Sequence, residues 1–296
     1  MELTSIKNIK ELLEKYRAKP SKGMGQNFLV HQLTLNKIIE AGQVNSGDTI
    51  LEIGPGIGTL TRELAKHAKQ VIAIEKDGMM VEILKETLLH FKNVNVINGD
   101  ILKMNFQIPN PKSQINPNAQ LPKKYKIVAN IPYYLTSPLI RMFLETKNQP
   151  ELMVLMLQKE VAQRICAVPP NMSILAVSVQ FYATAKVMFS VGKEKFWPSP
   201  KIDSAIIKIT PHKTDLPVPA ELFFQIVKAG FSHPRKQLAN NFYQILGGKS
   251  ASAKSSGVTK EEIIAWLSKN NLKPSQRAET LTIQDWVNLT KSYQQF

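Results

Sequence analysis

The chain has 296 residues, 43% hydrophobic and 21% charged, so it can fill a sizeable core and is not a disordered protein. Its 38 Lys and Arg residues outnumber 23 Asp and Glu residues, and the formal charge of +15 favours a polyanionic partner. A single cysteine excludes an internal disulfide and a cysteine-based zinc site. The apolar runs are too short to span a bilayer, and the first 20 residues do not resemble a signal peptide. We expect a cytoplasmic protein without metal or membrane contact.

The first two thirds of the chain alternate between strand and helix patterns. Helical spacing of leucines and isoleucines predicts an amphipathic helix within 1–19, and a second helix covers 31–42. Strands are then predicted at 49–53, 70–75, 94–98, 125–129 and 152–157. Helices are predicted at 59–68, 78–91, 138–146 and 159–167. This alternation predicts a parallel sheet with helices on both faces.

The last third changes character. Two antiparallel strands are predicted at 187–191 and 204–209, and a proline-rich linker follows at 211–219. Beyond it the periodicity is only helical, with helices predicted at 222–229, 236–246, 261–270 and 283–293. We therefore expect an α/β domain over 1–210 and a helical domain over 211–296. Prolines and polar residues over 105–124 predict a surface insertion.

A glycine-rich turn follows the strand predicted at 49–53. Residues 54–58 read Gly-Pro-Gly-Ile-Gly, and glycines at such a turn let the backbone approach a ligand closely. A dinucleotide-binding turn has the spacing Gly-x-Gly-x-x-Gly, whereas the third glycine here comes one residue earlier. The spacing resembles the S-adenosylmethionine loop of class I methyltransferases, with Gly54 and Gly56 next to the cofactor.

Two acidic residues lie where the next two strands end, one as the last residue of its strand and one just after the strand. Glu75 ends the strand at 70–75, where a carboxylate can accept hydrogen bonds from both hydroxyls of a ribose. A solvated charge at a strand end is the alternative, but the glycine turn in register favours ribose binding. Asp100, in Asn-Gly-Asp at 98–100, is placed to accept from an adenine amino group, or it only forms a turn after Gly99.

The tetrapeptide Asn-Ile-Pro-Tyr at 130–133 follows the fourth strand, at the sheet edge where open α/β sheets bind ligands. It could mark only a turn, but it resembles the Asn/Asp-x-Pro-Tyr signature of amino-methyltransferases. An adenine amine is a poor nucleophile because its lone pair is delocalised into the ring. The Asn130 oxygen and a backbone carbonyl can accept its N–H groups, and Tyr133 offers a stacking face for an extruded base.

Two further motifs complete a resemblance to a known family. Residues 25–29 read Gly-Gln-Asn-Phe-Leu, and 196–204 read Phe-Trp-Pro-Ser-Pro-Lys-Ile-Asp-Ser. With the motifs above, in this order, the chain over about 20–245 resembles the ribosomal RNA adenine N6-dimethyltransferases, closest to those of the small subunit. The resemblance implies a class I, Rossmann-like methyltransferase sheet with a small all-helical C-terminal domain. It implies cofactor contacts at Asn27, Leu29, Gly54, Gly56, Glu75, Asp100 and Asn130.

The resemblance also implies contacts with RNA. Phe196 would clamp the target base opposite Tyr133, although an aromatic residue beside prolines is by itself more typical of a loop anchor. Arg235 and Lys236 lie at the start of a predicted helix, where cations oppose the helix dipole, and this favours an anionic partner.

The function implied is transfer of methyl groups from S-adenosylmethionine to N6 of two adjacent adenosines. The target would be the hairpin loop near the 3′ end of small-subunit (16S) rRNA, within a pre-assembled small ribosomal subunit, and the protein would be a monomer. The large-subunit (23S) methyltransferases that confer macrolide resistance share the catalytic motifs and are one alternative. A non-catalytic RNA-binding or transcription-factor homologue is another, and a nicotinamide oxidoreductase is disfavoured by the glycine spacing.

Overall fold

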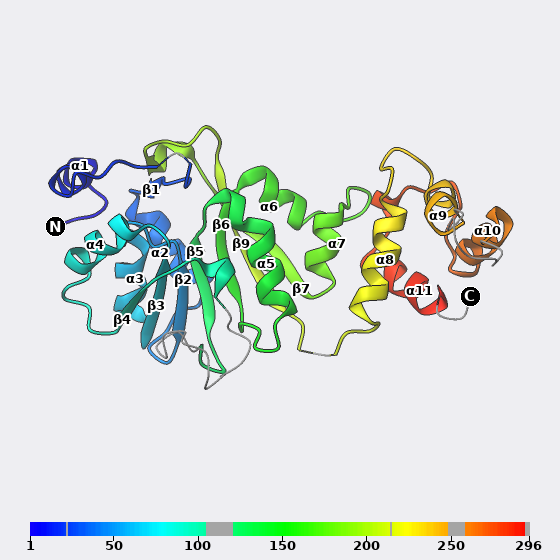
Figure 1. Cartoon of the computed structure of the whole chain (residues 1–296), viewed down its shortest axis with the longest axis horizontal. Helices are drawn as coiled ribbons and strands as arrows, with labels where there is room; N and C mark the ends of the chain where they lie inside the picture. Colours follow the sequence, from blue (N-terminus) through cyan, green and yellow to red (C-terminus); the bar gives the residue numbers. More distant parts are fainter. Residues whose placement is uncertain (22, 105–120, 214, 248–257, 294–296) are drawn as a thin grey trace. The chain divides into compact units, whose positions relative to one another are not determined.

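The computed structural model describes residues 1–21, 23–104, 121–213, 215–247 and 258–293. The chain forms two compact units, which are described separately (Figure 1). The first comprises Met1–Ala162 and Thr184–Pro211, and the second comprises Gln163–Ala183 and His212–Phe296. Most of the insertion predicted at 105–124 lies outside the described residues.

The predicted parallel sheet is confirmed in the first unit. Seven strands lie in the order β4-β3-β2-β5-β6-β9-β7, and the neighbouring strands from β4 to β6 are parallel, whereas β9 runs antiparallel to β6. The strands are β2 (Thr49–Ile53), β3 (Gln70–Glu75), β4 (Val94–Asn98), β5 (Lys126–Asn130), β6 (Met153–Gln158), β7 (Ala183–Val191) and β9 (Ser204–Pro211). Because the strands from β2 to β6 point the same way, their carboxyl ends form one edge, at which polar side chains from separate motifs gather.

Helices pack on this sheet through apolar stripes at helical spacing. Leu35 and Ile38 of α2 and Leu64 of α3 share a buried cluster with Ile50 and Val154 of the sheet. In Figure 1, α5 crosses in front of the sheet, and its Phe143 meets Tyr125 edge-on at 6.4 Å. The helices of this unit include α2 (Gln32–Ala41), α3 (Thr59–His67), α4 (Gly78–Thr87), α5 (Thr136–Glu145) and the start of α6 (Lys159–Ile165).

The predicted N-terminal helix is present as α1 (Ile6–Lys15). Its buried Ile9, Leu12 and Leu13 pack in one cluster with Phe28 and Ile57. Ser5 begins the helix by accepting a hydrogen bond from Asn8 N. This helix therefore packs against the glycine turn at 54–58, through Ile57.

A two-stranded ribbon was not predicted. The strand β1 (Phe28–Leu29) pairs antiparallel with β8 (Phe196–Trp197), with Leu29 opposite Phe196. Strands of two residues carry no periodicity, so the pattern of apolar residues could not reveal them. The ribbon joins the motif at 25–29 to the motif at 196–204, which are far apart in the sequence.

The second unit is helical, but its extent differs from the predicted domain over 211–296. It also contains residues 163–183, which include the unpredicted helix α7. The reason is packing: Phe181 stacks on Phe223 at 3.9 Å, and His212 N donates to Tyr182 O at 2.9 Å. Its further helices are α7 (Ile174–Gln180), α8 (Ala220–Gly230), α9 (Leu238–Leu246), α10 (Lys260–Lys269) and α11 (Ile283–Tyr293).

Candidate cofactor and substrate site

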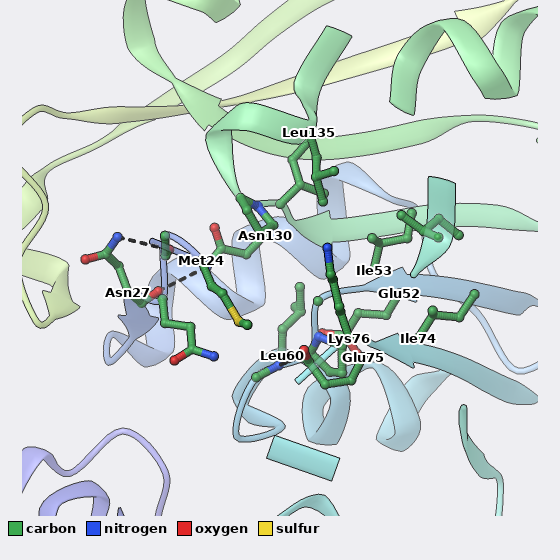
Figure 2. A pocket seen from close by; sticks show the side chains of 18 of the residues that line it. Met24, Asn27, Glu52, Ile53, Leu60, Ile74, Glu75, Lys76, Asn130 and Leu135 are labelled. Carbon is green, nitrogen blue, oxygen red and sulfur yellow. Dashed lines mark hydrogen bonds between the residues drawn. The ribbon is translucent and has the colours of Figure 1, made fainter. Parts of the chain in front are cut away.

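A cavity lies at the carboxyl edge of β2, β3 and β5 in the first unit (Figure 2). It brings together residues from five sequence motifs. The predicted residues that line it are Asn27, Leu29, Gly54, Gly56, Glu75, Asp100, Asn130 and Phe196. The side chain of Tyr133 lies outside the described part of the structure, so its predicted place in the site stays a prediction. Arg235 and Lys236 belong to the second unit.

The glycine turn has a backbone that other residues rarely adopt. Gly54, Gly56 and Gly58 have φ angles of +69°, +59° and +91°, in the left-handed region where an L side chain is strained. A Cβ at Gly56 would also lie 3.1 Å from the ring of Phe28. Glycine here therefore serves both the turn and the close packing of β1, and the turn presents backbone to the cavity.

Glu75 is held by two backbone donors. Its side chain is 6% exposed, its Oε2 accepts from Gly56 N at 3.0 Å, and its Oε1 accepts from Asp77 N at 2.8 Å. Burial raises the pKa of this carboxyl, and the two N–H groups act against that rise. Each carboxylate oxygen has a second lone pair, so the group can still accept from two ligand hydroxyls.

Asp100 is paired with a lysine that sequence reasoning missed. Its Oδ2 lies 3.0 Å from Lys76 Nζ, and its Oδ1 accepts from Leu102 N at 3.1 Å, which caps the short helix Ile101–Lys103. The hydrogen bond from Lys76 is the main reason that the pKa of Asp100 is lowered. Asp100 is therefore an ionised acceptor at neutral pH. The only available signal for Lys76 was its position directly after Glu75.

The Asn130 amide is oriented by the loop at 25–29. Its Nδ2 donates to Asn27 O at 3.4 Å, and Asn27 Nδ2 donates to Gly25 O at 3.2 Å (Figure 2). Because the nitrogen is assigned by its acceptor, the other end of the amide is the oxygen. This arrangement places a hydrogen-bond acceptor at the end of β5.

Phe196 and Leu29 line the cavity but are largely enclosed by protein. They are 4% and 3% exposed and belong to the same hydrophobic cluster as Val191 and Met156. Their positions follow from the ribbon, in which they lie opposite each other. A role of Phe196 in clamping a base stays a prediction.

A second buried carboxyl, Glu52, also lines the cavity. It is 1% exposed, and its Oε2 has no hydrogen-bond partner among the described residues. Burial raises its pKa to about 8, the Thr61 hydroxyl acts against that rise, and the nearby charge of Glu75 adds to it. The sequence patterns alone gave Glu52 no role. The signal was a single acid within the otherwise apolar strand 50–53.

The basic pair in the second unit occupies a well-fixed turn. Arg235 and Lys236 are exposed and precede α9, which begins at Leu238 rather than at the predicted 236 because Gln237 is extended. The buried Asn241 Nδ2 donates to Gly230 O at 2.6 Å and to His233 O at 3.0 Å. The turn thus holds two cations at the surface of this unit.

The family model of the ribosomal RNA adenine dimethylases matches residues 17–291. The chain belongs to this family. It is 40% identical over 96% of its length to a ribosomal RNA small subunit methyltransferase A of Dehalococcoides mccartyi, of which it covers 92%. It is 37% identical over 99% of its length to the protein of the same name from Levilactobacillus brevis, of which it covers 96%.

Solved structures agree with family membership. A dimethyladenosine transferase from Plasmodium falciparum has a TM-score of 0.73 and 27% identity, with 90% of this chain and 98% of that chain covered. The 23S rRNA methyltransferase ErmE has a TM-score of 0.68 and 24% identity over the same shares, and this likeness shows the fold alone. The family identifies the chain as an rRNA adenine dimethyltransferase with a Rossmann-like methyltransferase fold.

Two features are absent from the described part of the chain. None of its helices is both long and apolar enough to cross a membrane. In the same residues, no cluster of three or more His, Cys, Asp and Glu side chains is placed to hold a metal ion.

Proposed function

We propose that this enzyme uses S-adenosylmethionine to dimethylate N6 of two adjacent adenosines in the hairpin loop near the 3′ end of small-subunit rRNA. The observation that carries the proposal is the cavity itself, in which the glycine turn, Glu75, Asp100 and the Asn130 amide surround one space. The choice of the small subunit is supported by relatives at 37–40% identity that carry that substrate in their names.

The hydrogen-bonding groups that line the cavity match those of the cofactor. Glu75 has free lone pairs for two ribose hydroxyls, and the ionised Asp100 is an acceptor for an adenine amino group. Gly54 and Gly56 line the cavity with backbone alone, so a ligand can approach it closely. S-adenosylmethionine, when bound, supplies a methyl group on a positively charged sulfur that leaves readily. We assign Asn27 and Leu29 to the same site because both line the cavity.

The chain's own contribution to the chemistry centres on Asn130. Its oxygen would accept one N–H of the target amine and draw the lone pair out of conjugation with the ring. Pro132 donates no hydrogen bond and fixes the backbone after Asn130. When the nitrogen–methyl bond forms, the amine loses one proton. The monomethylated amine keeps one N–H, so Asn130 retains a partner for the second transfer. Tyr133 and Phe196 would hold the base.

The two units would have different roles in acting on the RNA. The first would be catalytic, and the helical second unit would bind phosphates through Arg235 and Lys236, which are exposed on a fixed turn. Contacts with phosphates position the RNA without reading its sequence, so the shape of a pre-assembled small subunit would select the target. We propose that the protein works as a monomer in the cytoplasm.

The test is methylation of unmodified small and large ribosomal subunits, followed by mass spectrometric mapping. We expect N6,N6-dimethyladenosine at two neighbouring positions of the small subunit. Dimethylation confined to the large subunit would instead support the macrolide-resistance type of activity. RNA binding without any methylation would support a non-catalytic homologue.

A further inference from the structure

Glu52 combines deep burial with one carboxyl oxygen that has no hydrogen-bond partner among the described residues. Its neighbours in β2, namely Ile50, Leu51 and Ile53, are apolar and buried, and Glu52 itself is 1% exposed. Its Oε2 makes no hydrogen bond to any described residue, although the side chain lines the cavity. An ionised carboxylate with an unpaired oxygen in such a place is strongly disfavoured, so the neutral acid is the stable form.

Glu52 and Glu75 form an unequal pair. Glu75, at the end of the neighbouring strand β3, has N–H donors from Gly56 and Asp77 and is therefore suited to carry a negative charge. Glu52 has no backbone N–H donor to its Oε2, only the Thr61 hydroxyl favours its charged form, and the charge of Glu75 makes its ionisation harder. When two neighbouring carboxyls differ in this way, the proton resides on the one with the poorer donors.

The other elements around Glu52 do not neutralise it. The helix α3 contributes the buried hydroxyls of Thr59 and Thr61, and the Thr61 hydroxyl acts against the rise in the pKa of Glu52 without cancelling it. The strand β5 contributes the uncharged amide of Asn130 at this edge. Lys76 lines the same cavity, but its ammonium group is paired with Asp100 at 3.0 Å.

We propose that Glu52 is a proton switch for cofactor binding, protonated when the protein is free and ionised once the positively charged cofactor enters the cavity. This inference rests on the proposed use of S-adenosylmethionine. That molecule carries a sulfonium, an ammonium and a carboxylate, and so has one net positive charge. In a cavity of low dielectric, an added cation favours the charged form of an acid, and the proton of Glu52 leaves to solvent.

The reaction reverses the switch. During transfer the carbon–sulfur bond breaks, its electron pair stays on sulfur, and the methyl group forms a bond to nitrogen. The cofactor product, S-adenosylhomocysteine, is a thioether with no net charge, and the amine has released one proton. Without the cation, Glu52 regains its high affinity for a proton. The site therefore distinguishes the charged cofactor from its uncharged product by the charge state of Glu52.

Calorimetry can count the protons. At pH 6.5, binding of S-adenosylmethionine is measured in buffers of different ionisation enthalpy, for the wild type and for Glu52→Gln. Because a group with a pKa of about 8 is almost fully protonated at that pH, we expect the wild type to release close to one proton more than the variant. Ionisation of the cofactor itself is common to both proteins and cancels. The exposed Glu11→Gln on α1 is the matched control and should behave as the wild type.

Two more measurements extend the test, and the first of them needs only the wild type. Wild-type protein should release clearly fewer protons with S-adenosylhomocysteine than with S-adenosylmethionine. The affinity of the wild type for S-adenosylmethionine should rise about tenfold from pH 6 to pH 7, and that of Glu52→Gln should stay nearly constant. If Glu52→Gln does not fold, the difference in proton release between the two ligands on the wild type still tests the proposed switch.

The outcomes separate this inference from the proposed function. Binding of S-adenosylmethionine with equal proton release from the wild type and Glu52→Gln would overturn the switch alone. Equal release with the two ligands on the wild type would do the same. Failure of both ligands to bind any of the proteins would overturn the proposed cofactor, and the switch with it.

Discussion

The two halves of the cavity are built in different ways. On the side expected to hold the cofactor, Glu75 and Asp100 each accept from a backbone N–H two residues away, at 2.8 and 3.1 Å, and the most distant donor, Gly56 N to Glu75, is only 19 residues away. On the side expected to hold the base, Asn130 has one longer hydrogen bond of 3.4 Å, to a loop 103 residues away in sequence. Phe196 reaches this side only through the ribbon with β1. Local structure therefore determines the first half, and long-range packing determines the second.

The largest effect is expected at Phe196, which lies on the side of the cavity expected to hold the base and is packed in the hydrophobic core. Phe196→Ala removes a side chain that is 4% exposed within a hydrophobic cluster, and it should lower the free energy of unfolding by about 3–5 kcal/mol. Chemical denaturation measures this loss. Phe196→Leu should keep most of the stability but remove the aromatic face, so a normal methylation rate in that variant would exclude a stacking role.

Asn130→Ala should separate chemistry from binding. Its amide acts on the reacting amine, so the single-turnover rate should fall about 100-fold, the scale seen when one group that acts in the transition state is lost. Affinity for rRNA should change little, because phosphate contacts dominate it. Rapid quench measurements and filter binding would show the split. A variant with a normal rate and weakened RNA binding would contradict the assignment.

Sequence patterns were most informative where structure is local. The strand β2 lies where its pattern predicted it, and the turn at 54–58 has the positive φ angles that its glycines indicate. The ribbon of β1 and β8 was not predicted, because strands of two residues carry no periodicity. The grouping of 163–183 with the helical unit was not predicted either. It depends on aromatic stacking between Phe181 and Phe223, which are 42 residues apart.

The same contrast holds for the site. Glu75 and Asp100 follow strands whose ends must meet at one sheet edge, so their convergence was predictable. Lys76 was not, because the direction of a long side chain depends on a partner from another element. Glu52 was visible as an acid in an apolar strand, but its lack of donors is a property of the packed structure.

A glycine exchange tests how far the cofactor side depends on its turn. Gly56→Ala introduces a methyl group at φ +59° and 3.1 Å from Phe28, and it should weaken S-adenosylmethionine binding by about 1–2 kcal/mol. Gly78→Ala is the matched control, because nothing lies within 4 Å of its added Cβ and its φ is not positive. Calorimetric dissociation constants for the two variants should therefore differ by about tenfold. Equal constants would show that the turn tolerates a side chain.

The smallest effect is expected at the ion pair of Lys76 and Asp100, since Lys76 is half exposed. The pair lowers the pKa of Asp100, so it stabilises the folded protein above about pH 4, the usual range of an aspartate, and the benefit disappears as the pH falls through the lowered value. Lys76→Met should therefore lower the melting temperature slightly at pH 6, and the difference from the wild type should shrink as the pH falls below about 4. The exposed pair of Lys85 and Glu82 offers Lys85→Met as a control without this dependence on Asp100. A difference that persists unchanged to pH 3 would mean that the stem of Lys76, rather than its charge, supports the cofactor side of the cavity.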